Sequence, residues 1–389
     1  MNRTRINRIK IPLIAFIFSL SCFFLFSCNQ DSIFYDISNE PEPKDPLVNG
    51  SPTNIVAVKN RLYVGTRFSN KIYCYANYDG VLGWDTITLP SGYLGQLATD
   101  GDSLYVLIFQ NRDPLKSSTI RRYNVSSGSW EVSYPPISGY SIQTIYGTGN
   151  KIFAGGQYQN NRKNFAIIFL ERASDSLNVI RYGTSLLKGV AQSASGTVYL
   201  ATAGSGLFAF NESTLDTTIV SGTEKANLNG IMNVGGNIVA VGADGTVYSD
   251  IGGRFNNVNA GVSFTGAMCV WLDRKNQWRP SLLLLGIRGK GTSLTHGYRE
   301  MLLENGRPTF NIKSPGDDSP TSIVNKAKYD AGIGTHPIES IYQVPDFSSG
   351  GPFYYRDFTD DPTWEPPIFA STSKNGLWVY RKGEWNAEE

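Results

Sequence analysis

The chain has 389 residues, of which 35 are basic and 33 acidic, so its formal charge at pH 7 is only +2. Nucleic-acid and polyanion binders need a clear basic excess, and this balance argues against both classes of function. The chain contains 40 glycines, and aromatic residues make up 12% of it. Glycine in tight turns, with aromatic and β-branched residues between the turns, is typical of a strand-rich fold.

The first 28 residues have the pattern of an export signal. Four basic residues precede an apolar stretch, residues 11–26, that is too short for a stable membrane span. The stretch ends in Ser27 and Cys28, which resemble the lipobox of bacterial lipoproteins, where the chain is cut before the cysteine and its thiol is acylated. The resemblance implies a signal peptide over residues 1–27 and lipid attachment at Cys28. The alternatives are an ordinary signal peptide and an uncleaved anchor.

Residues 29–52 are polar and contain four prolines, as expected of a tether between the lipid and a folded body. We therefore predict a lipidated tether at residues 28–52 and a single folded domain at residues 53–389. One apolar piece, residues 33–37, either stays in the tether or supplies a strand that closes the folded domain. In the lipoproteins of enteric bacteria, aspartate after the acylated cysteine marks retention at the inner membrane. Asn29 stands at that position here, so the resemblance favours the outer membrane or cell surface over the inner membrane.

Seven pairs of short apolar strands, each pair joined by a polar turn, follow along the folded domain. Six of the pairs recur 40 to 48 residues apart, and the last follows after 86 residues. The anchor residues used for this spacing are Tyr63, Tyr105, Phe153, Tyr199, Val239, Leu283 and Phe369. A further apolar stretch precedes each pair, and an aromatic-led strand follows several of them. This period is typical of a four-stranded blade.

The repeats predict an all-β fold, a single β-propeller with seven four-stranded blades. The doubled last spacing predicts an insertion before the last blade, at about residues 304–365. The alternative is an eighth blade hidden in that segment. The sequence ends soon after the seventh pair, which leaves little chain for an outer strand of the last blade.

The copies at residues 197–210 and 369–380 share the pattern of a glycine, an aromatic-bearing strand, a turn and a Gly-Leu-aromatic strand. This pattern resembles the repeats of the two-component-regulator and kelch-like propeller families. Members of those families are mostly sensing or binding modules, so the resemblance implies the fold and no activity. The sequence has neither the Gly-His and Trp-Asp signature of some propellers nor a full aspartate box of the sialidase type.

We predict no catalytic residue, metal site or cofactor. The chain has only two histidines, each in a turn or insertion, and they are His296 and His336. The acidic runs at residues 100–102 and 316–318 offer too few oxygen ligands for calcium, and the first is more simply a turn. The run at residues 357–361 is richer in oxygen ligands, and we interpret it as a solvated loop, with a metal site as the alternative. Cys74 and Cys269 lie in non-neighbouring repeats and are expected to be buried thiols.

Aromatic residues of the predicted insertion form the candidate partner-binding site. They are Phe353, Tyr354, Tyr355, Phe358 and Trp364. Exposed tyrosine and tryptophan side chains anchor many contacts with proteins and sugars. The alternative is that these side chains cap the ring.

Together these features predict a membrane-tethered extracytoplasmic lipoprotein that acts as a non-catalytic binding or assembly platform. Its expected partners are the membrane, through the lipid, and an envelope protein or glycan. The alternative function is a glycan-active hydrolase or lyase with paired carboxylates, roughly 5–10 Å apart, in the propeller funnel. A structural envelope protein without a specific ligand is the third interpretation.

Overall fold

The computed structural model describes most of the chain from residue 48 onwards. The described residues are 48, 50–59, 61–78, 81–172, 174–251, 254–273, 279–288, 297–313, 333, 337–344, 367–373, 376–381 and 384–388. All of them belong to one compact unit, residues 46–389. The predicted signal peptide, Cys28 and the apolar piece at residues 33–37 lie outside the described residues.

The described chain folds into seven antiparallel sheets of four strands each, with the strands of each sheet in chain order. Blade 1 consists of β1–β4, blade 2 of β5–β8, and so on to blade 7, β25–β28. The innermost strands are β1 (Pro52–Val58), β5 (Tyr93–Thr99), β9 (Tyr140–Thr148), β13 (Leu187–Gln192), β17 (Leu228–Val234), β21 (Ser263–Asp273) and β25 (Ile338–Gln343). The second strands are β2 (Arg61–Thr66), β6 (Ser103–Phe109), β10 (Lys151–Tyr158), β14 (Val198–Thr202), β18 (Asn237–Gly242), β22 (Arg279–Arg288) and β26 (Ile368–Thr372).

The outer half of each blade has the same regular order. The third strands are β3 (Lys71–Tyr78), β7 (Ser118–Asn124), β11 (Phe165–Glu171), β15 (Gly206–Asn211), β19 (Thr246–Ser249), β23 (Gly297–Glu304) and β27 (Leu377–Arg381). The outer strands are β4 (Val81–Thr88), β8 (Ser129–Tyr134), β12 (Ser176–Gly183), β16 (Asp216–Ile219), β20 (Asn256–Asn259), β24 (Arg307–Lys313) and β28 (Glu384–Ala387).

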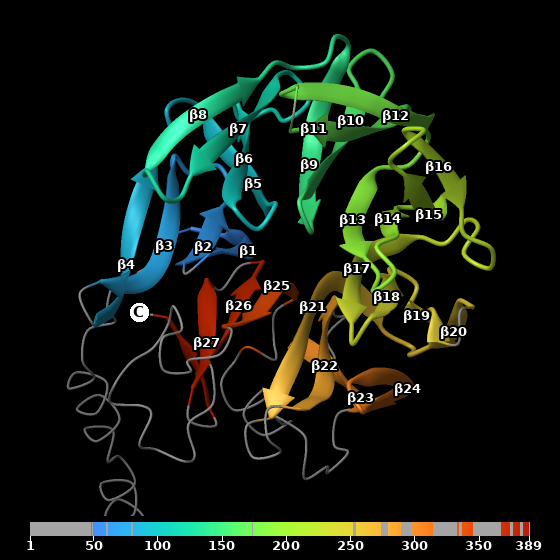
Figure 1. Cartoon of the computed structure of the whole chain (residues 1–389). Helices are drawn as coiled ribbons and strands as arrows, with labels where there is room; N and C mark the ends of the chain where they lie inside the picture. The colour runs from blue at the N-terminus through green and yellow to red at the C-terminus, as the bar shows by residue number, and fades with distance from the viewer. Residues whose placement is uncertain are drawn as a thin grey trace, which may run out of the picture. The chain divides into compact units, whose positions relative to one another are not determined.

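The blades form a closed ring. Each innermost strand contacts the innermost strand of the next blade, and β25 of the last blade contacts β1 of the first. Figure 1 shows the red last blade beside the blue first blade. The predicted β-propeller of seven four-stranded blades is therefore confirmed, and the strands of the described residues leave none for an eighth blade.

The predicted strand pairs are the second and third strands of the blades. Their nearly continuous apolar sequences arise because each of these strands has another blade on both sides. In β6 every residue is buried. The last blade corrects one expectation, because Glu384–Ala387 is long enough to form its outer strand, β28. The predicted insertion at residues 304–365 includes two regular blade strands, β24 and β25.

Side-chain amides tie neighbouring blades together near the centre of the ring. The Asn54 side chain of β1 donates to the Leu97 carbonyl of β5 at 2.7 Å and accepts from the Leu97 amide at 3.1 Å. Gln96 repeats this contact one blade further on, because its side-chain oxygen accepts from the Ile145 amide at 3.1 Å. Through these bonds a side-chain amide of one blade pairs with backbone groups on the innermost strand of the next blade.

The first and last blades meet in what we call the closing seam, formed by blades 7 and 1. The Ile55 amide donates to the Ser340 hydroxyl at 3.1 Å near the centre. Further out, the Trp84 indole N–H donates to the Glu388 carboxylate at 2.9 Å. Among the described residues, side-chain and packing contacts close the ring, and no described strand is shared between the two blades.

The two cysteines of the described chain are buried and form no disulfide, as predicted. The Cys269 sulfur accepts a hydrogen bond from the Gln343 amide at 3.1 Å, between blades 6 and 7. Burial raises the pKa of the Cys269 thiol to about 12, so it stays protonated at neutral pH. Within the described residues, no helix is long and apolar enough to span a membrane.

Candidate functional site

All five aromatic residues of the predicted partner-binding site lie outside the described residues, as do His296 and His336. The connections between strands nevertheless define two faces of the ring. In blade 3, residues 159–164 and 184–186 lie on what we call the upper face, where second strands turn into third strands and each blade leads to the next. Residues 149–150 and 172–175 lie on the opposite, lower face. In blade 7, β25 ends and β26 begins on the lower face, where Gln343 pairs with Ile368.

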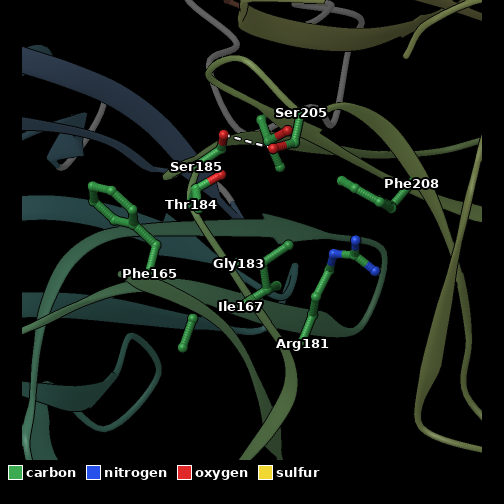
Figure 2. Close-up of a pocket in the computed structure, with 10 residues that line it drawn as sticks. Phe165, Ile167, Arg181, Gly183, Thr184, Ser185, Ser205 and Phe208 are labelled. Carbon is green, nitrogen blue, oxygen red and sulfur yellow. Dashed lines mark hydrogen bonds between the residues drawn. The ribbon is translucent and has the colours of Figure 1, made fainter. Parts of the chain in front are cut away.

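A cavity of about 160 Å³ opens on the upper face between blades 3 and 4. Figure 2 shows Phe165, the Arg181 guanidinium, Phe208 and a pair of serine hydroxyls arranged around it. Its lining residues come from both blades and are Phe165, Ala166, Ile167, Arg181, Gly183, Thr184, Ser185, Thr202, Ser205 and Phe208. We call this cavity the Arg181 pocket.

A β-bulge directs Arg181 into the pocket. The pairing of β11 with β12 shifts between Ile167, which faces Arg181, and Ile168, which faces Val179. The extra residue is Ile180, which packs in the core cluster shared by blades 3 and 4. Two successive residues of β12 therefore face blade 4, where regular alternation would turn one of them away.

The Arg181 guanidinium lies flat against the neighbouring blade. Its central carbon is 3.9 Å from the centroid of the Phe208 ring, within the range of a cation–π contact. One terminal nitrogen donates to the Thr217 hydroxyl at 3.3 Å. Among the described residues no carboxylate lies within 4 Å of this guanidinium, although the side chain is only partly exposed.

Hydroxyl groups form the opposite wall of the pocket. Ser185, in the connection from blade 3 to blade 4, shares a hydrogen bond of 2.6 Å with Ser205. Ser205 lies in the tight β14–β15 turn, where Gly206 has a φ of +84°. The Thr202 hydroxyl donates to the Gly206 carbonyl at 2.8 Å and holds this turn in place. The turn at residues 204–206, which lies within the repeat copy at residues 197–210, thus presents a hydroxyl to the pocket.

A group of tyrosines, the tyrosine cluster, lies beside the pocket on the other side of β12. Its members are Tyr140, Tyr158 and Tyr182. The ring centroids of Tyr140 and Tyr158 are 5.2 Å apart, and those of Tyr140 and Tyr182 are 6.2 Å apart. Tyr182 is 68% exposed, the largest value among the exposed large hydrophobic side chains of the described chain. The cluster and the pocket together give blade 3 a polar-aromatic upper edge.

A polar cluster around Asp100 lies on the lower face, between blades 2 and 3. Asp100 accepts from the backbone amides of Asp102 and Ser103 at 3.0 and 2.8 Å, as expected of the predicted turn. Its other oxygen accepts from the Tyr105 hydroxyl at 3.0 Å and pairs with Arg172 at 3.1 Å. Burial, and next the Asp100 charge, raise the pKa of Tyr105 to about 12. Asp100 is thus fully paired, and its arrangement is that of a structural link.

The described residues contain no group of three or more side chains suited to hold a metal ion. At the centre of the ring, burial lowers the pKa of Lys188 on β13, Arg288 lowers it further and Glu339 on β25 opposes the shift. The seven innermost strands carry only two carboxylic residues, Glu339 near the upper end of β25 and Asp273 at the lower end of β21. These strands alone do not place two carboxylates at one end of the funnel.

The sequence analysis missed the Arg181 pocket and the tyrosine cluster. Phe208 was recognised only as part of the repeat, and Arg181 belongs to a different blade, so no spacing rule connects them. A weak signal was present in Arg181 and Tyr182, a charged and an aromatic residue directly before Gly183 at the end of a strand. Such an end lies at a ring face, where propeller loops converge.

Comparisons with known proteins support the fold and nothing narrower. No family model matches the sequence, and no curated protein matches it. Among solved structures, the chain is similar to a chain in the crystal structure of the mitotic checkpoint complex, with a TM-score of 0.52 and 12% sequence identity. The similarity covers 88% of this chain and 97% of that one. Since 1247 solved chains match, the shared architecture does not select one function; it places this chain among the β-propellers.

Proposed function

We propose that this protein is a membrane-tethered extracytoplasmic lipoprotein that serves as a non-catalytic binding or assembly platform for an envelope protein or glycan. The N-terminal export pattern and Cys28 support the tether. The propeller fold supports the platform, because propellers commonly mediate binding through one face of a rigid ring. In this arrangement the upper edge of blade 3 is the binding surface.

The observation that carries this proposal is the exposure of Tyr182 beside the Arg181 pocket. A tyrosine side chain costs free energy to leave in water, and tyrosine and arginine are enriched among the residues that dominate binding energy at interfaces. Here Tyr182 stacks loosely on Tyr140 and stays 68% exposed, while Arg181 lies on the other side of the same strand. A partner that covers this edge would bury the Tyr182 side chain and contact the Arg181 pocket at the same time.

Tyr182→Ala should reduce capture of the partner by about 30-fold, the effect of losing a dominant interface residue. The measurement is affinity capture from detergent-solubilised envelope with the full-length chain, followed by quantitative mass spectrometry. Leu215→Ala is the matched control, because Leu215 is also exposed, at 39%, but lies in the lower-face turn between β15 and β16. Equal capture by wild type and the Tyr182 variant, or loss with the Leu215 variant alone, would contradict the proposed surface.

Cys28→Ser should abolish incorporation of a fatty-acid label into the chain, because the proposed acylation uses the Cys28 thiol. The measurement is metabolic labelling of cells with an alkyne-bearing palmitate analogue, followed by detection on the purified full-length protein. Cys22→Ser is the control, since Cys22 lies in the segment expected to be removed. Label that persists in the Cys28 variant would rule out the lipid tether at this position.

A further inference from the structure

We propose that the Arg181 pocket binds an acidic sugar residue, a monosaccharide unit that carries a carboxylate. This inference rests on the proposed function and names the ligand class of the same surface. It depends on three properties of the pocket, namely a guanidinium without a carboxylate partner among the described residues, a wall of hydroxyl groups and a small volume.

The guanidinium supplies the site for a negative charge. Arginine carries five N–H donors in a planar fork that matches a carboxylate, and the hydrogen bond to Thr217 engages one terminal nitrogen of Arg181. The Phe208 ring covers one face of the guanidinium at 3.9 Å and fixes its orientation. Among the described residues no carboxylate competes for it. A ligand carboxylate can therefore approach the edge of a held guanidinium without displacing an internal ion pair.

The opposite wall favours a sugar over an acidic protein side chain. Thr184, Ser185 and Ser205 bring hydroxyls to the pocket, and each hydroxyl can both donate and accept. A sugar ring offers hydroxyl partners along its whole edge to Thr184 and to the Ser185–Ser205 pair, whose shared hydrogen bond uses only part of their bonding capacity. The methylene stem of glutamate or aspartate offers these hydroxyls no partner. Phe165 adds an apolar surface on the side away from Phe208 (Figure 2).

The volume of the pocket limits the ligand to one such unit. A cavity of about 160 Å³ is comparable to the roughly 150 Å³ cavity that holds a benzene-sized molecule in another protein. It is smaller than the roughly 300–1,000 Å³ of a typical drug-sized site. A sugar acid is larger than benzene, so the pocket would take the carboxylate-bearing edge of one acidic residue, and the rest of the glycan would run over the upper face towards the tyrosine cluster.

The test is isothermal titration of the full-length chain in detergent with D-glucuronate and with D-glucose, which differ by the carboxylate. We expect glucuronate to bind at least about 10-fold more tightly than glucose, the effect of one charged hydrogen-bonded contact. Arg181→Gln should remove this preference. Arg162→Gln, which removes an exposed arginine from the β10–β11 connection of the same face, should keep it.

Three outcomes of the titrations with the two sugars overturn the inference. They are equal binding of glucuronate and glucose by wild type, no binding of either, and unchanged preference in Arg181→Gln. Tighter binding of N-acetyl-L-glutamate than of glucuronate also overturns it, in favour of an acidic peptide. The comparison of the two sugars on wild type decides the matter even if the Arg181 variant does not fold. If the sugar titrations overturn this inference but capture of the partner still depends on Tyr182, the proposed platform function stands without this ligand.

Discussion

Replacing Asp100 by alanine should lower the free energy of unfolding by about 3–5 kcal/mol. The Asp100 carboxylate has 0% exposure and is held by two backbone amides, the Tyr105 hydroxyl and Arg172. Its removal leaves the buried Ser103 amide and the buried Tyr105 hydroxyl without this acceptor. Arg172 belongs to blade 3, so the same change also loosens the joint between blades 2 and 3. Urea denaturation followed by tryptophan fluorescence measures the loss.

Asp102→Ala is the matched control for this experiment. Asp102 lies two residues further along the same turn and is 3.7 Å from the same arginine, but its side chain is 66% exposed. An exposed ion pair contributes little, so the free energy of unfolding should change by no more than about 0.5 kcal/mol. Equal losses from the two variants would show that burial of Asp100 does not carry the stability.

Phe369→Ala should also cost about 3–5 kcal/mol, because it opens a cavity in the closing seam. Phe369 has 0% exposure, and its ring centroid lies 5.3 Å from that of Tyr75 and 5.9 Å from that of Trp84, both in blade 1. The substitution therefore removes the aromatic side chain that joins the two ends of the ring. Thermal and urea denaturation measure the loss, and hydrogen exchange locates it.

Phe153→Ala provides the comparison inside the ring. Phe153 also has 0% exposure, lies on a second strand and meets Phe210 of the next blade edge-on, with centroids 5.2 Å apart. The loss of stability should be similar, but the chain still connects blades 3 and 4 directly. Faster exchange of amides in blades 1 and 7 should therefore appear only in the Phe369 variant. The same exchange pattern in both variants would contradict a special weakness of the seam.

Much of the fold was predictable because each repeat shows the same order of apolar runs and polar turns within a short stretch of sequence. Second strands such as β6 are buried on both faces, and their apolar runs are visible without knowledge of the partner strands. Outer strands are harder to recognise, because one face is solvated and their sequences are short. β28 is an example: it has four residues, and from the sequence alone we expected too little chain for an outer strand of the last blade. The spacing of 86 residues was ambiguous because the connections from β24 to β25 and from β25 to β26 are both long.

The candidate site was not predictable to the same degree. Asp100 was correctly placed in a turn, but its burial depends on Arg172 and Tyr105, which reach it from the next blade and the next strand. Arg181 faces Phe208 only because Ile180 forms a bulge, and bulges leave no reliable mark in a single sequence. The burial of Asp100 and the contact of Arg181 with Phe208 depend on how two blades pack, which a single sequence does not show. The strands of one hairpin depend mainly on its own residues and could be predicted from them.

The closing seam has a consequence for the order of assembly. Six joints of the ring connect consecutive blades, which can pack as soon as both have been synthesised. The seventh joins Trp84 to Glu388 across 304 positions, and tying two chain segments so far apart costs an entropy of about 5 kcal/mol by simple loop-closure reasoning. Until the last strand exists, the chain is an open arc whose two end blades each expose an apolar flank. The residues around β28 therefore complete the ring. A product cut short before them would remain an open arc that exposes apolar surface at both ends and is prone to associate with other chains.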